Sequence, residues 1–300
     1  MSEAAIGWSE ASEWDLSRVM ELKGSHRIAV VIPARNEQQT IASVVQIIRS
    51  SLGGLADDVI VMDSLSSDAT GAIAADAGAQ VHSVADVRPD LGVHAGKGEA
   101  LWKSLFVTDA DVLVFIDADL TDWGPHFVTG LVGPLLADPR VMLVRGFYDR
   151  VLNVGSSPSL EGGRVTELVA RPWLALHRPE LAGVIQPLAG EWAIRRSAFE
   201  RLSVPMGYGV ELSTLLDIHD RFGLESIAQV DLGRRAHRHQ SLHDLSAMAV
   251  ELMVVAERRS HGGKVYDPGE SVPLRLPTVD RSWKVREVPT GERPPHVDVQ

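Results

Sequence analysis

The sequence contains no cysteine among its 300 residues. This absence excludes disulfide bonds, zinc sites built on thiolates and a cysteine nucleophile, and it agrees with a protein of the cytoplasm. A basic start followed by an apolar core is also missing from the first 25 residues, so no signal peptide is predicted. Apolar runs stay well short of the ~20 residues that cross a bilayer, so we expect no membrane partner.

Net positive charge is lacking as well. The chain has 29 Lys and Arg against 40 Asp and Glu, a formal charge of -11. Because nucleic acids and anionic membranes are bound by basic surfaces, this balance argues against both as partners. The cationic segment 234–239 therefore stands out. If it is extended, alternation places Arg235, His237 and His239 on one side, although a solvated charged face is the common alternative.

What is present predicts an α/β protein. Hydrophobic residues make up 45% of the chain, enough for one large domain or a sheet domain with a smaller region attached. Strands and helices alternate along the first half, which is typical of right-handed βαβ units and predicts a Rossmann-like, mostly parallel sheet flanked by helices. The expected strands are 27–32, 58–62, 80–83, 112–116 and 141–144, and the clearest expected helices are 41–51, 69–77 and 242–258.

The strand predicted at 112–116 is the most informative stretch. Its branched and aromatic run is typical of a strand buried on both faces, and it ends in Asp117-Ala118-Asp119. Open α/β sheets bind ligands at the carboxyl ends of their strands. Two carboxylates there suit a divalent cation and a diphosphate that the cation carries. Taken alone, the same residues also fit a polar turn or a helix cap.

Two loops before this strand carry further candidates. Pro33-Ala-Arg-Asn-Glu37 follows the first strand and lacks the glycines of a dinucleotide-binding loop. Its amide and carboxylate suit hydrogen bonds to a uracil or a ribose, although capping the next helix is an alternative. Gly96-Lys97-Gly98 opens a later helix, where a mobile ammonium and free backbone N–H groups would bind an anion. We expect that helix to bring Lys97 beside the two aspartates.

The order and spacing of these segments resemble the nucleotide-binding half of GT-A glycosyltransferases, in which a D-x-D motif holds a metal on the diphosphate of a sugar nucleotide. The second half narrows the likeness to the retaining glucosyl-3-phosphoglycerate synthases. The segments that carry it are 162–172, 186–191, 207–211 and 236–238. The similarity covers about residues 27 to 250 and implies the GT-A fold.

The resemblance implies metal-dependent transfer of glucose from UDP-glucose or another nucleoside diphosphate glucose to the 2-hydroxyl of 3-phosphoglycerate. The implied cofactor is Mg²⁺ or Mn²⁺. Front-face attack is favoured over a covalent intermediate, because neither Glu191 nor Glu211 is marked as a nucleophile. Two alternatives stay open: transfer of mannose from GDP-mannose to the same acceptor, and a sugar-nucleotide-binding protein without catalysis.

The resemblance also assigns roles to residues. Asp119 and His237 are the implied metal ligands, and Asp119, Lys97 and Glu211 are the implied catalytic residues. Arg164 offers a planar fork that suits a phosphate, although its glycine neighbours also fit a simple turn. The implied donor-binding residues are Pro33, Ala34, Arg35, Glu37, Ser64, Lys97, Asp117, Ala118, Asp119 and Tyr208. The implied acceptor-binding residues are Gly163, Arg164, Thr166, Arg235 and His239.

We expect four regions along the chain. They are an N-terminal helical extension at 1–26, a nucleotide-sugar-binding half at 27–150, a smaller acceptor-binding half at 151–245, and a C-terminal helix and tail at 246–300. Residues 262–300 are rich in proline, glycine and charge, which predicts an extended arm or partly mobile tail. Members of the family commonly dimerise, so the resemblance also implies a homodimer.

Overall fold

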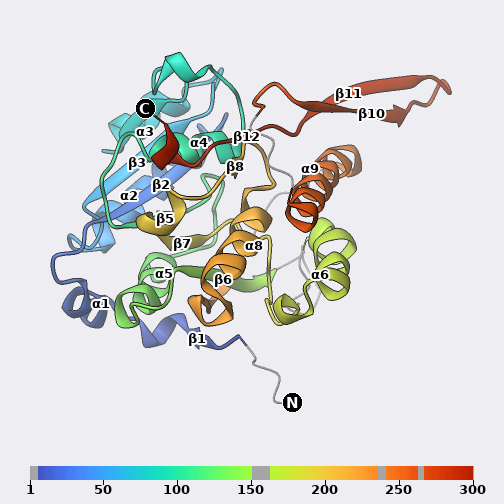
Figure 1. Cartoon of the computed structure of the whole chain (residues 1–300). Helices are drawn as coiled ribbons and strands as arrows, with labels where there is room; N and C mark the ends of the chain where they lie inside the picture. The colour runs from blue at the N-terminus through green and yellow to red at the C-terminus, as the bar shows by residue number, and fades with distance from the viewer. Residues whose placement is uncertain (1–5, 151–162, 236–240, 263–266, 300) are drawn as a thin grey trace, which may run out of the picture.

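The computed structural model describes residues 6–150, 163–235, 241–262 and 267–299. An eight-stranded sheet in the order β1-β9-β6-β7-β5-β2-β3-β4 forms its centre, with helices on both faces (Figure 1). The strands of this sheet are β1 (Trp8–Glu10), β2 (Ile28–Ala34), β3 (Asp58–Asp63), β4 (Gln80–Ser83), β5 (Val112–Phe115), β6 (Leu143–Arg150), β7 (Trp192–Arg195) and β9 (Ile227–Arg235). Among the described helices, none combines the length and the apolar character needed to cross a bilayer.

The remaining elements surround the sheet or follow it. The α-helices are α1 (Leu16–Lys23), α2 (Ile41–Ser51), α3 (Thr70–Asp76), α4 (Lys97–Ser104), α5 (His126–Ala137), α6 (Arg171–His177), α7 (Arg196–Phe199), α8 (Val210–Phe222) and α9 (Leu242–His261). A π-helical turn, η3 (Thr166–Ala170), precedes α6. The strands outside the central sheet are β8 (Val204–Pro205), β10 (Ser271–Pro277), β11 (Trp283–Pro289) and β12 (Glu292–Arg293).

The predicted mostly parallel sheet is confirmed. In the sheet as described, β7 alone runs antiparallel to its neighbours β5 and β6. Parallel pairing aligns Val31 with Phe115 and Ala34 with Asp63, so β2, β3 and β5 end at one edge of the sheet. This shared edge is what brings the three polar loops after these strands together.

Alternating side chains build two cores, one on each face of the sheet. In β2, Ala29 and Val31 belong to the core beneath α4 and α8, whereas Val30 and Ile32 belong to the core beneath α2 and α5. Every residue from Ile28 to Ile32 is fully buried. A strand covered on both faces needs apolar side chains at both parities, which explains the uninterrupted apolar run.

The N-terminal segment contains more than the predicted helix. Asp15 accepts a hydrogen bond from the Arg18 amide, and this cap starts α1 at Leu16, within the helical extension expected at 1–26. Trp14 is buried just before the helix. Strand β1, which the sequence analysis did not predict, pairs in parallel with β9 and extends the central sheet by one strand.

The C-terminal segment, predicted as an extended arm or a partly mobile tail, forms an arm at β10 and β11 but is buried around β12. Strands β10 and β11 form a hairpin that projects from the body (Figure 1), and β12 then returns to pair with β8. Val288, Thr290, Glu292 and Arg293 are all buried. Charged residues fill these buried positions because each finds an oppositely charged partner, so composition alone did not reveal the burial.

Candidate active site

A cleft of about 370 Å³ opens at the carboxyl ends of β2, β3 and β5. This volume lies within the range of pockets that bind small organic ligands. The cleft is lined by Pro33, Ala34, Arg35, Glu37, Ser64, Ala95, Gly96, Lys97, Asp117, Ala118, Asp119, Gly207, Tyr208, Glu251 and Pro289. The structure thus gathers all ten residues expected to bind the donor around one cavity, while their individual roles stay predictions.

Lys97 lies between two carboxylates. Its Nζ is 2.7 Å from Asp117 Oδ1 and 2.8 Å from Glu211 Oε1. Burial lowers the pKa of Lys97, but the carboxylates of Asp117 and Glu211 raise it by more, so the net pKa lies above its ordinary value. The expected approach of Lys97 to the aspartates is confirmed. The expected mobility of its ammonium is wrong, because two ion pairs hold a side chain that is only 13% exposed.

The backbone around Lys97 does not offer the free N–H groups that the sequence suggested. The Gly96 amide donates to Ser64 Oγ at 3.1 Å, and the Gly98 amide donates to the Gly207 carbonyl at 3.2 Å. A Cβ atom at Gly98 would lie 1.8 Å from the Pro205 carbonyl oxygen. The glycines therefore allow the chain after β8 to approach α4 closely, which brings Tyr208 and Glu211 to the lysine.

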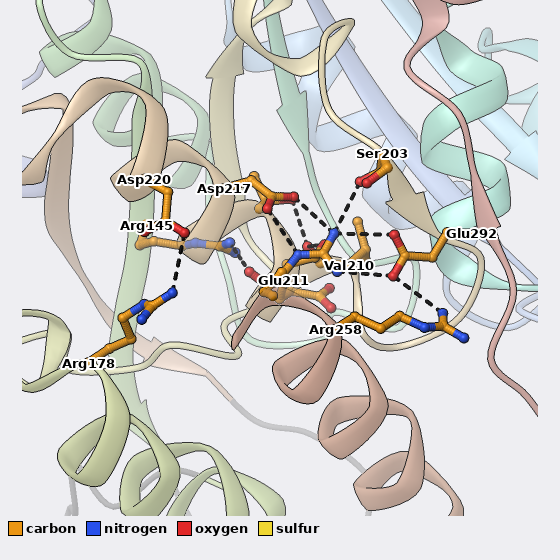
Figure 2. Close-up of polar contacts among 12 residues, drawn as sticks. Arg145, Arg178, Ser203, Val210, Glu211, Asp217, Asp220, Arg258 and Glu292 are labelled. Atoms are coloured by element: carbon orange, nitrogen blue, oxygen red, sulfur yellow. Dashed lines mark hydrogen bonds and ion pairs between the residues drawn. The ribbon is translucent and has the colours of Figure 1, made fainter. Parts of the chain in front are cut away.

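Glu211 stands in the first turn of α8, and its side chain is 6% exposed. The buried guanidinium of Arg145, from β6, donates to the Glu211 carbonyl oxygen (Figure 2) and lies 4.9 Å from the centre of the Trp192 ring. Burial lowers the pKa of Arg145 to about 10, and Glu211 opposes that shift. Arg145 thus fixes the start of α8. The role of Arg145 was not predicted, although an arginine directly after an apolar run was a visible signal.

The segment at Gly190-Glu191 makes room for Asp117. A Cβ atom at Gly190 would lie 2.2 Å from Asp117 Oδ2, so a larger residue there would displace the carboxylate. Glu191 is fully buried and does not line the cleft. Asp117 and Asp119 both line the same cavity.

The predicted metal site is only partly within the described chain. Among the described residues, no three His, Asp or Glu side chains cluster closely enough to hold a metal ion. His237 and His239 lie outside the described residues, and the side chain of Arg235 is not described either. Asp119, with Asp117 two residues before it, is a carboxylate that lines the cleft, and carboxylate oxygens are hard donors that suit Mg²⁺ or Mn²⁺.

Three residues predicted to bind the acceptor lie around the start of η3. Arg164 is exposed and Thr166 is buried at 3% exposure. Neither these two nor Gly163 lines the cleft, so the structure does not bring them to the lysine. Turn η3 packs against α9, which carries another cleft residue.

Glu251 of α9 lines the cleft and was not predicted from the sequence. It lies in the middle of α9 and lines the cleft beside Tyr208. The signal was an acid next to the apolar stripe of the helix, three residues after Met248 and one before Leu252. Pro289, from the end of β11, also lines the cleft and was not predicted.

A mostly parallel sheet that presents an Asp-x-Asp turn and a paired lysine at one edge defines a class, the GT-A glycosyltransferases. The family described as Glycosyl transferase family 2 matches residues 29–203. Glucosyl-3-phosphoglycerate synthase of Mycolicibacterium smegmatis is 44% identical over 290 residues, which cover 96% of this chain and 94% of that protein.

Comparison with solved structures leads to the same family. Glucosyl-3-phosphoglycerate synthase of Mycobacterium tuberculosis in complex with Mn²⁺, UDP-glucose and phosphoglyceric acid has a TM-score of 0.86 and 41% identity, covering 97% of this chain and 98% of that one. The same enzyme with Mn²⁺, UDP and glucosyl-3-phosphoglycerate has a TM-score of 0.86 and 42% identity, with 97% and 99% covered. This chain belongs to the glucosyl-3-phosphoglycerate synthase family.

Proposed function

We propose that this chain transfers glucose from UDP-glucose to the 2-hydroxyl of 3-phosphoglycerate, with retention of anomeric configuration and with Mn²⁺ or Mg²⁺ as cofactor. The observation that carries the proposal is Lys97, held at 2.7 Å from Asp117 and 2.8 Å from Glu211 in the cleft at the sheet edge. The names of the relatives support glucose rather than mannose as the transferred sugar.

In this proposal the donor lies along the sheet edge. The nucleoside binds over the ends of β2 and β3, at Pro33, Ala34, Arg35, Glu37 and Ser64. The diphosphate binds over the end of β5, beside Lys97, Asp117, Ala118 and Asp119. Asp119 and His237 hold the divalent ion, which when bound supplies positive charge that stabilises the departing diphosphate.

The protein's own groups do the remaining work. Lys97, kept protonated by its carboxylate neighbours, adds a second positive charge on the diphosphate. Glu211 accepts a hydrogen bond from a hydroxyl of the sugar or of the acceptor, and Tyr208 covers the sugar. Because Lys97 already neutralises Glu211, we favour front-face attack over a glutamate nucleophile. A trapped covalent adduct on Glu211 would contradict that preference.

The acceptor binds on the side of η3 and α9. Arg164 donates two hydrogen bonds to the phosphate, and Gly163 and Thr166 lie beside it. Arg235 and His239 face the carboxylate of the acceptor. We further infer that the protein acts in the cytoplasm as a homodimer, without nucleic acid or membrane as a partner. The net charge of -11 supports the last part of this inference.

The proposal is tested by a matrix of donors and acceptors. UDP-glucose, GDP-glucose and GDP-mannose are each offered with 3-phosphoglycerate or glycerate in the presence of Mn²⁺, and products are read by mass spectrometry. We expect a hexosyl phosphoglycerate from a glucose donor and none after chelation of the metal. Efficient product from GDP-mannose would instead select the mannosyl alternative, and tight donor binding without any product would select a binding protein.

Asp119→Asn supplies the residue-level test. We expect turnover to fall by about 100-fold or more, because the variant loses a carboxylate at the diphosphate. The matched control is Asp122→Asn, three residues further along the same loop and exposed. Near-normal activity of Asp119→Asn, with a melting temperature equal to that of the control, would refute the assignment.

A further inference from the structure

Glu251 is a cleft residue to which the proposed function gives no role. Its carboxylate accepts a hydrogen bond of 2.5 Å from the Tyr208 amide. A Cβ atom at Gly207 would lie 1.9 Å from Glu251 Oε2, so the carboxylate rests directly against the backbone of the loop between β8 and α8. Helix α9 thus places Glu251 against the loop that leads from β8 to Glu211.

A backbone amide, rather than an ion pair, holds the carboxylate of Glu251 within the described chain. Within the described chain, the Tyr208 amide is its hydrogen-bond donor, and no Lys or Arg forms an ion pair with it. The pKa of Glu251 is raised to about 7, mainly by burial and in smaller part by Glu211, against the lowering effects of the Tyr208 amide and Arg286. Withdrawing an acid from water beside a second acid costs stability, and such groups gather at functional sites.

The order of strands indicates which part of the donor lies near Glu251. Along the sheet edge, β3 and β2 come first, β5 follows, and β7 lies beyond β5. If the nucleoside covers β3 and β2 and the diphosphate covers β5, the hexose continues past β5. There Gly190, just before β7, touches Asp117, and Lys97 links Asp117 to the start of α8. Helix α9, with Glu251, packs on α8.

We propose that Glu251 binds a hydroxyl of the transferred hexose and thereby helps to select the donor sugar. This inference rests on the proposed function and deepens it. The oxygen that the Tyr208 amide does not use accepts a hydrogen bond from the sugar hydroxyl, and hydrogen bonds to a charged acceptor are among the stronger polar contacts. A site built around such a bond discriminates against sugars that lack the hydroxyl.

Glu251→Gln tests the proposal, because glutamine keeps the size and an oxygen that can accept from the Tyr208 amide. Calorimetry with Mn²⁺ present measures the Kd of UDP-glucose and of UDP for each protein. We expect the Kd of UDP-glucose to rise about tenfold or more, while the Kd of UDP stays within twofold. The control is Glu257→Gln on the same helix, where the side chain is 74% exposed.

Two results would overturn the proposal. One is an unchanged Kd for UDP-glucose, and the other is an equal loss of UDP and UDP-glucose affinity, which would mean that Glu251 only supports the loop. UDP-linked deoxyglucoses sharpen the test: the one whose Kd the substitution leaves unchanged identifies the hydroxyl, and equal weakening of them all would count against a hexose contact. Failure of the wild-type protein to bind UDP-glucose would instead refute the proposed function.

Discussion

Two carboxylates, those of Asp117 and Glu211, balance the positive charge of Lys97. A diphosphate entering the cleft competes with Asp117 and Glu211 for the same ammonium. We propose that the diphosphate shares this ammonium with Glu211, which therefore stays neutralised, in keeping with front-face attack.

Glu251 predicts a pH dependence of stability at the residue scale. Its folded pKa, about 7, lies above its ordinary 4.5. The folded protein therefore binds more protons than the unfolded chain between these values, so this residue lowers stability as pH rises through that window. Above pH 7 the penalty is complete, and below pH 4.5 it is absent.

We expect Glu251→Gln to melt at a higher temperature than the wild type at pH 8 and at an equal temperature at pH 4. Calorimetric melting of both proteins without nucleotide measures the difference. Asp217 and Arg286 are unchanged in both proteins, so their contributions cancel in the comparison. If the difference in melting temperature is the same at pH 8 and at pH 4, the raised pKa of Glu251 is contradicted.

At the scale of elements, β12 holds α4 in place. Arg293 donates to both oxygens of Glu99, with Nε to Oε2 at 2.7 Å and NH2 to Oε1 at 2.6 Å, and its NH1 donates to the Leu91 carbonyl. Glu99 is fully buried and stands two residues after Lys97. A second group of ion pairs joins Arg258 and Arg259 of α9 to Glu292 of the same strand. Arg259 also pairs with Asp217 of α8, and Figure 2 shows Glu292 beside Arg258.

Arg293→Ala leaves the buried Glu99 with Lys103 at 3.5 Å as its remaining partner. We expect the free energy of unfolding to fall by about 3–5 kcal/mol, as when one side of a buried ion pair is removed. Arg140→Ala is the control, because that guanidinium is 72% exposed and its pair with Asp138 contributes about 0–1 kcal/mol. Denaturant titration checks both, and equal small losses would contradict the role of β12.

Elements with regular apolar patterns were predictable. The apolar run at 112–116 fits a strand buried on both faces, and the apolar stripe at 41–48 fits a helix buried on one face. The bounds predicted for β5 and α2 are therefore close to those of the structure. The cleft followed, since parallel strands share an edge. By contrast, β12 has two residues, both charged, and the burial of Arg293 depends on Glu99, which is 194 positions away. Glu251 reaches the cleft only through packing of α9 on α8, which no local pattern encodes.

At the scale of the whole molecule, the proposed homodimer has a candidate surface. Helix α9 contacts η3 and both strands of the projecting hairpin. These elements expose large apolar side chains, which monomers seldom gather in one region. They are Leu168 and Leu176 before and in α6, Leu242 and Met253 in α9, and Trp283 and Val285 in β11.

We expect light scattering to report twice the chain mass of 32.5 kDa. Met253→Arg should shift that mass to the monomer, because a charge would be buried in an apolar interface. Met20→Arg, on α1, serves as the control, since that residue is 38% exposed away from these elements. A monomeric wild type would remove the homodimer from the proposal.

The pairing of Arg293 with Glu99 spans 194 positions. During synthesis, the segments that build the central sheet leave the ribosome well before residue 293. Until residue 293 has been synthesised, the chain lacks the guanidinium that pairs with the buried Glu99, and contacts of such long range form late and slowly. Placement of α4 by β12 therefore has to wait for almost the whole chain.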